Sequence, residues 1–182
     1  MKKLIAIIAM LFITSVGESQ LNLDSLASKD SSMHRFVNEW LGSKYRAGGN
    51  NKEGVDCSGF SRILYSTIYN QEIPRTAKEQ YNHSLRIKKN NLQLGDLIFF
   101  RSKYSPTGWH VAVYLYDGYF VHSGNRHTGV CVGNLQTPYY TRNYKGAGRF
   151  KIHTINKTIL YNQFRDYTDW LEKQEQNKDT YE

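Results

Sequence analysis

The chain has 182 residues, of which 24 are basic and 16 acidic, so its formal net charge is +8. This length fits one domain with a proper hydrophobic core and short extra segments at its ends. The basic residues form no clustered stripe within a nucleic-acid-binding signature, so we expect no nucleic-acid partner. The positive charge would attract the protein to anionic polymers of the cell envelope. The alternative is that the charge only increases solubility.

Residues 1–19 have the three-part layout of a secretory signal. Lys2 and Lys3 precede the apolar run LIAIIAMLFITSV, and small residues follow up to Ser19, where we expect cleavage. The apolar run is too short for a convincing membrane span, and no lipid-accepting cysteine follows it. We therefore expect an exported protein of the periplasm, envelope or exterior, with no stable membrane span after cleavage. Residues 20–30 are polar and predicted to be flexible.

The first helix is predicted to begin at Ser31 or Ser32, either of which could cap it, and to run to about Leu41. Gly42 follows as the residue that ends it. Residues 43–54 form a glycine-rich loop that leads into the next helix.

That next helix begins within VDCSGF, and it places a cysteine in its first turn. Asp56 is a good N-cap, and Phe60 and Leu64 follow Cys57 at helical spacing. Free backbone N–H groups and the helix dipole favour a thiolate there, which is the form that attacks carbonyls. The alternative is that Cys57 is a small buried apolar residue, as most free cysteines are. The hexapeptide alone leaves both interpretations open.

The rest of the chain predicts a short helix and then a series of strands. Thr76 and Glu79, just after Pro74, form a capping-box pattern. Five runs with strand character follow, separated by turn residues: GDLIFF, WHVAVYLY, YFVHSG, GVCVG and AGRFKIH. Helices followed by consecutive strands indicate an α+β domain with a mostly antiparallel sheet of about five strands. This domain should span residues 31–154, with a last amphipathic helix and a polar tail in residues 155–182.

Two histidines lie inside apolar strands, where burying a polar side chain costs free energy unless it is hydrogen-bonded. They are His110 and His122; the others are predicted to be solvated (His34, His83, His127 and His153). Cys131 lies in the run GVCVG, so we expect it to pack in a strand and not to form a disulfide with Cys57.

The two histidines share a face of the sheet only in one hairpin register. A two-residue loop at Asp117 and Gly118 would put them on opposite faces. A three-residue loop would set small Ala112 opposite His122, with His110 on the same face, and would give Gly118 a left-handed conformation. We predict the three-residue loop. In the alternative, one histidine is functional and the other is merely buried.

Four residues are possible ligands for a zinc ion: Cys57, His110, His122 and His127. The chain has no H-E-x-x-H and no paired C-x-x-C motif, and a cysteine at a helix start suits nucleophilic chemistry better. We therefore predict no metal and no cofactor.

In order and spacing, the motifs KYRAGG, VDCSGF, IPRTAKEQ, LGDLIFF, WHVAVYLYDG and FVHSG resemble those of the NlpC-type cysteine peptidases. These are bacterial cell-wall endopeptidases with a papain-like fold, in which nucleophile-bearing helices pack on an antiparallel sheet. The resemblance spans about residues 33–150 and is greatest to exported members with a single domain. It implies cleavage of the bond between D-γ-glutamate and a diamino acid in peptidoglycan stem peptides.

The resemblance also implies roles for six residues. Cys57 would be the nucleophile, His110 the general acid and base, and His122 the residue that orients His110. Tyr45 matches a tyrosine whose hydroxyl lies beside the nucleophile. Two substrate-binding residues, Asp56 and Ser58, would line the site for the stem peptide. Departures from the family pattern are Ala47 and Ala112, which affect the shape of the pocket.

Two other functions are compatible with the sequence. One is an amidase of a related Cys/His fold that cuts between muramic acid and L-alanine. The other is a non-catalytic envelope-binding module, for which the 14 tyrosines and the positive charge could serve. In each case we expect a monomer.

Overall fold

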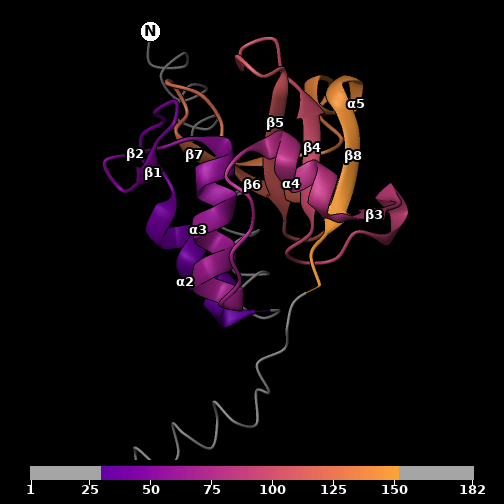
Figure 1. Ribbon diagram of the computed structural model, residues 1–182, viewed down its shortest axis with the longest axis horizontal. Helices are drawn as coiled ribbons and strands as arrows, with labels where there is room; N and C mark the ends of the chain where they lie inside the picture. The colour runs from indigo at the N-terminus through magenta and orange to yellow at the C-terminus, as the bar shows by residue number, and fades with distance from the viewer. Residues whose placement is uncertain (1–29, 152–182) are drawn as a thin grey trace, which may run out of the picture. The chain divides into compact units, whose positions relative to one another are not determined.

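The computed structural model describes residues 30–151 (Figure 1). Its first helix, α2 (Ser31–Trp40), buries an apolar stripe formed by Met33, Phe36, Val37 and Trp40. Asp30 caps this helix, because its carboxylate accepts hydrogen bonds from the N–H groups of Ser32 and Met33. The prediction that Ser31 or Ser32 is the cap is therefore wrong by one or two residues.

A short hairpin, β1 (Asn50–Asn51) and β2 (Gly54–Val55), leads into helix α3 (Cys57–Tyr69). The helix begins at Cys57 with Asp56 as its cap, as predicted. It ends at Tyr69, and the next residue, Asn70, has a left-handed conformation.

Helix α4 (Ala77–His83) carries the predicted capping box. The Thr76 hydroxyl accepts from the Glu79 N–H, and the Glu79 carboxylate accepts from the Thr76 N–H. After α4 come strand β3 (Leu85–Ile87) and a 3₁₀ turn, η1 (Lys89–Asn91), neither of which was predicted.

The main sheet has six strands in the order β3-β8-β4-β5-β6-β7, and every neighbouring pair is antiparallel. The prediction of an antiparallel sheet is confirmed, with one strand more than expected. Its remaining strands are β4 (Leu97–Arg101), β5 (Trp109–Tyr114), β6 (Tyr119–Ser123), β7 (Val130–Asn134) and β8 (Tyr144–Arg149). The last strand was predicted at AGRFKIH, but it begins three residues earlier and ends at Arg149. A short helix, α5 (Pro138–Asn143), precedes it and was not predicted.

Apolar side chains pack on both faces of the sheet. Helices α3 and α4 cover one face (Figure 1), where Phe60 and Leu64 meet Phe99 and Val111 in the larger core. The smaller core, on the opposite face, contains Ile98, Phe100, Ala112, Phe120 and Leu135, with Tyr140 of α5 packed against it. The chain is thus an α+β domain whose β5 strand carries core residues on both faces.

Three predicted segments lie outside the described residues: the signal, the segment up to residue 29 that was expected to be flexible, and the C-terminal helix. Within residues 30–151, no helix is long and apolar enough to cross a membrane.

Candidate active site

Cys57 occupies the first position of α3, and the residue is 9% exposed. The Asp56 carboxylate accepts a 2.7 Å hydrogen bond from the Gly59 N–H and fixes where the helix begins. The preceding residue is also held, because the Ser123 hydroxyl of β6 donates a 2.7 Å bond to the Val55 carbonyl. The cysteine is therefore positioned from both sides of the helix start.

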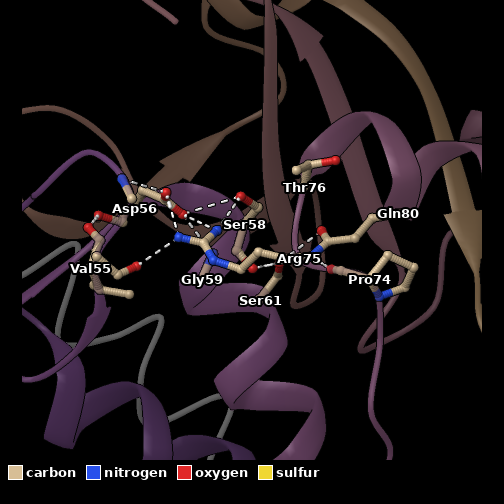
Figure 2. A network of polar contacts seen from close by, with 12 residues as sticks. Val55, Asp56, Ser58, Gly59, Ser61, Pro74, Arg75, Thr76 and Gln80 are labelled. Carbon is tan, nitrogen blue, oxygen red and sulfur yellow. Dashed lines mark hydrogen bonds and ion pairs between the residues drawn. The ribbon is translucent and has the colours of Figure 1, made fainter. Parts of the chain in front are cut away.

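Arg75 binds the residues on both sides of Cys57 (Figure 2). Its guanidinium donates to both carboxylate oxygens of Asp56, at 3.0 and 2.8 Å, and to the Ser58 hydroxyl at 3.0 Å. A fourth bond, at 3.2 Å, reaches the Gly49 carbonyl in the glycine-rich loop. Burial tends to raise the pKa of Asp56, but hydrogen bonds from Arg75 and from the Gly59 N–H outweigh it, and the net pKa is lowered. Asp56 is therefore a carboxylate near neutral pH.

Gln80 extends this network into the core (Figure 2). Its side chain is fully buried, and its amide donates to the carbonyls of Ser58 and Pro74 at 3.1 and 2.8 Å. Its amide oxygen accepts from the Ser61 hydroxyl at 2.9 Å. Arg75 and Gln80 both belong to the motif IPRTAKEQ, but no role was predicted for either residue.

Asp56 and Ser58, the predicted substrate-binding residues, are both hydrogen-bonded to Arg75 within the protein. Ser58 is only 6% exposed. Their contact with a stem peptide stays a prediction.

The hairpin between β5 and β6 has the predicted register. Val113 pairs with Val121, and the Leu115 N–H donates to the Tyr119 carbonyl, which makes the loop three residues long. Gly118 has the expected positive φ of 84°, and Asp117 also has a positive φ, of 48°.

The ladder between β5 and β6 ends at Val113 and Val121, and the next positions, Ala112 and His122, are not paired. On the other edge of β6, His122 pairs with Cys131 of β7. The pairing of β5 with β6 therefore stops just before His122, which keeps its partner on β7.

The structure brings His110 and His122 together. Nε2 of His110 lies 2.6 Å from Nδ1 of His122, and the two rings are nearly perpendicular, at 86°. Nε2 of His122 lies 3.2 Å from the Tyr140 hydroxyl and 3.5 Å from the Cys131 sulfur. Nδ1 of His110 takes no part in this chain of contacts. Cys131 packs in its strand and, like Cys57, is a free cysteine, as predicted.

Burial keeps the side chains of Cys57 and His110 neutral. It raises the pKa of Cys57 to about 11, although the Val111 backbone next to His110 favours the thiolate. Burial also lowers the pKa of His110 to about 4, and that of His122 well below its usual value. The thiolate that the helix start was predicted to favour at Cys57 is therefore not the resting form of the substrate-free protein.

Tyr45 lies near Cys57. It bridges to Val55 two residues before Cys57, and it is half-buried. Its pKa is raised by burial first and then by the nearby Cys57 and Asp56. Its hydroxyl is therefore neutral near neutral pH and can donate a hydrogen bond.

The remaining described histidines are far less buried than His122. His83 and His127 are exposed, and half-buried His34 lies 2.9 Å from the side-chain nitrogen of Asn38. His153 lies outside the described residues. Within residues 30–151, no group of three or more His, Cys, Asp or Glu side chains is arranged to hold a metal ion.

A cysteine at a helix start, a histidine pair on a neighbouring antiparallel sheet and the order of the elements define a papain-like domain. Residues 42–149 match the NlpC/P60 family, and the chain belongs to that family.

Two curated relatives and one solved structure illustrate the match. Murein DD-endopeptidase MepS/murein LD-carboxypeptidase of Escherichia coli is 32% identical over 139 residues, 75% of this chain and 72% of that protein. The γ-D-glutamyl-L-lysine dipeptidyl-peptidase of Bacillus cereus is 37% identical over 112 residues, 61% of this chain and 33% of that protein. The crystal structure of an NlpC/P60 family protein from B. cereus superposes with a TM-score of 0.60 and 34% identity. That match covers 66% of this chain and 39% of the solved one, so it spans about two-fifths of the longer protein.

Proposed function

We propose that this chain is a peptidoglycan hydrolase, a cysteine endopeptidase that cleaves the D-γ-glutamyl–diamino acid bond of stem peptides through a thioester. One observation carries the proposal: Cys57 begins a helix packed on the strand that carries His110, whose Nε2 lies 2.6 Å from His122. A nucleophile, a base and a residue that orients the base are the parts that such a reaction needs.

The reaction begins from a neutral pair. Since Cys57 is a thiol and His110 a neutral imidazole, His110 Nδ1 accepts the thiol proton as the sulfur attacks the γ-glutamyl carbonyl carbon. The carbonyl oxygen then carries the negative charge. The backbone N–H of Cys57 and the Tyr45 hydroxyl would stabilise this oxyanion. His122 holds the imidazolium through its short contact with Nε2.

The carbon–nitrogen bond then breaks. His110 gives its proton to the departing amine of the diamino acid, and the glutamyl carbonyl stays on Cys57 as a thioester. A water molecule attacks the thioester while His110 accepts one of its protons. The thiolate leaves, recovers that proton from His110, and the free γ-carboxylate product departs.

The names of the two curated relatives point to different bonds. The B. cereus enzyme is named for a γ-D-glutamyl-L-lysine bond, whereas MepS is named as a DD-endopeptidase. Cleavage of a D,D-bond in a peptide cross-link is therefore the second candidate. The amidase and the non-catalytic binding module are the remaining alternatives from the sequence.

Mass spectrometry of purified peptidoglycan after digestion by the full chain distinguishes these functions. The proposal predicts stem peptides that end at D-glutamate, together with products that begin at the diamino acid. Loss of cross-linked dimers with intact stems would support the DD-endopeptidase, and stems released from the glycan at L-alanine would support the amidase. An unchanged digest would support the binding module.

We also propose that the protein is exported and acts as a monomer, with residues 1–19 as the signal. Cell fractionation and N-terminal sequencing test the export, and we expect the mature chain outside the cytoplasm to begin near residue 20. Size-exclusion chromatography with light scattering tests the monomer.

A further inference from the structure

The far nitrogen of His122 is held by a residue outside the three predicted catalytic positions. Nε2 of His122 lies 3.2 Å from the Tyr140 hydroxyl, and the two rings are nearly perpendicular, at 85°. Tyr140 belongs to α5, the short helix that the sequence did not predict.

The Tyr140 ring has a fixed place in the smaller core. It packs edge-on against Phe120, with ring centroids 4.8 Å apart, and lies 5.2 Å from Phe100. The next residue anchors the helix, because the Thr141 hydroxyl donates a 2.8 Å bond to the Leu135 carbonyl. Burial raises the pKa of Tyr140 to about 12, so near neutral pH its phenol keeps its proton and carries no charge.

The mechanism needs one tautomer of each histidine. His110 must keep Nδ1 free of a proton to accept the one from Cys57, so its neutral ring carries the proton on Nε2. That proton is donated to Nδ1 of His122, 2.6 Å away. His122 must then carry its own proton on Nε2, the atom that faces Tyr140. A buried N–H requires an acceptor.

We propose that Tyr140 is a positioning residue whose phenolic oxygen accepts the Nε2 proton of His122 and thereby selects the tautomer in which His110 can act as a base. This inference rests on the proposed cysteine mechanism. Without the oxygen of Tyr140, the His122 proton moves to Nδ1, the bond between the histidines reverses, and His110 carries its proton on Nδ1. It then faces the thiol as a donor and cannot take the thiol proton.

Cys131 is the other neighbour of the same nitrogen, at 3.5 Å. A thiol sulfur is a weaker acceptor than a phenolic oxygen. Cys131 therefore contributes little to the selection of the tautomer, and its replacement by alanine distinguishes the two neighbours.

The test compares Tyr140→Phe with Tyr139→Phe and Cys131→Ala in the full chain. Tyr139 is the matched control, since it lies on the same helix, is 39% exposed and bonds no histidine among the described residues. Nitrogen-15 NMR of labelled histidine, assigned with single His→Asn variants, reports which ring nitrogen is protonated without any need for activity. Kinetics on a stem peptide give kcat and KM separately, and thermal unfolding shows whether each variant is folded.

Wild type, Tyr139→Phe and Cys131→Ala are expected to show His122 protonated on Nε2, and folded Tyr140→Phe to show it protonated on Nδ1. The kcat of Tyr140→Phe should fall by about 10- to 100-fold, as for one lost buried hydrogen bond, with KM unchanged. An unchanged tautomer in Tyr140→Phe overturns the inference, as does the Nδ1 tautomer in wild type. If wild type cleaves no stem peptide but the tautomers behave as stated, the proposed function fails and the role of Tyr140 on His122 stands.

Discussion

Replacing Arg75 by methionine should destabilise the domain far more than the same change at an exposed arginine. Methionine keeps much of the apolar stem of Arg75 but removes four hydrogen bonds, three of them to Asp56 and Ser58. The side chains of Arg75 and Asp56 are 33% and 13% exposed, so the carboxylate would stay largely buried with its cation gone.

The expected loss in unfolding free energy for Arg75→Met follows from this burial. Removing one partner of a fully buried ion pair costs about 3–5 kcal/mol, and exposed pairs contribute only about 0–1 kcal/mol. Since a third of Arg75 is exposed and backbone N–H groups still bond to Asp56, we expect a loss of about 2–3 kcal/mol in the free energy of unfolding. At about 4 °C per kcal/mol for a domain of this size, Tm should fall by about 8–12 °C.

The chain offers a matched control in Arg62. Its guanidinium also bonds a carboxylate twice, to Glu72 at 3.0 and 2.8 Å, but the two side chains are 42% and 65% exposed. Arg62→Met should therefore cost less than about 1 kcal/mol. Urea unfolding of both variants near neutral pH measures the difference. Equal destabilisation by the two changes would refute the reasoning.

The stability lost in Arg75→Met should also depend on pH, and the direction follows from the pKa of Asp56. The pKa of Asp56 is lowered in the folded state, so the stability it confers is full above its unfolded pKa of about 3.9 and is lost as the pH falls below that value. The gap in unfolding free energy between wild type and Arg75→Met should thus narrow below about pH 4. A gap that widens with acid would contradict this account.

Three further predictions concern the site itself. Alkylation of Cys57 by iodoacetamide, followed by mass spectrometry, should accelerate steadily toward alkaline pH because burial raises its pKa to about 11; a plateau at mildly acidic pH would indicate a resting ion pair. His122→Asn should retain more kcat than His122→Ala because an amide can still bond to His110, and equal losses would argue against an orienting role. Gly59→Ala should lower stability by about 1–3 kcal/mol in urea unfolding, because its Cβ would lie 2.4 Å from the Gly49 carbonyl oxygen; wild-type stability would contradict this close approach.

Local rules predicted the parts of the fold that depend on neighbours in the sequence. The Asp56 cap and the capping box of Thr76 and Glu79 involve residues three apart, and both are present. Strand parity around Gly118 predicted that His110 and His122 share a site. Each of these features follows from backbone geometry over a few residues.

The features that were not predicted depend on contacts between distant parts of the chain, or on segments whose sequence pattern is too short or too weak to indicate a helix or a strand. Strand β3 was not predicted. It lies at the edge of the sheet and pairs with β8 alone, and its first residue, Leu85, is 54% exposed. Helix α5 begins at Pro138 and has only six residues, so its sequence looks like a turn. Arg75 lies 19 residues from Asp56, and no local rule joins them.

The wrong prediction of a thiolate at Cys57 also arose from a contact between distant parts of the chain. A cysteine at a helix start predicts a thiolate if only the helix is considered. The packing of Cys57 on β5 removes water from the sulfur, and this desolvation outweighs the helix and raises the pKa. Burial of that kind can be read only from the assembled core.

The most direct test of the central claim uses the two cysteines of the chain as a matched pair. Hydrolysis of a defined stem peptide at the D-γ-glutamyl bond is measured for wild type, Cys57→Ala and Cys131→Ala by mass spectrometry of the products. The account predicts that Cys57→Ala loses at least about 10³-fold in rate, as expected for removal of a nucleophile, while Cys131→Ala stays within about tenfold of wild type. Hydrolysis by Cys57→Ala at a rate near that of wild type would contradict it.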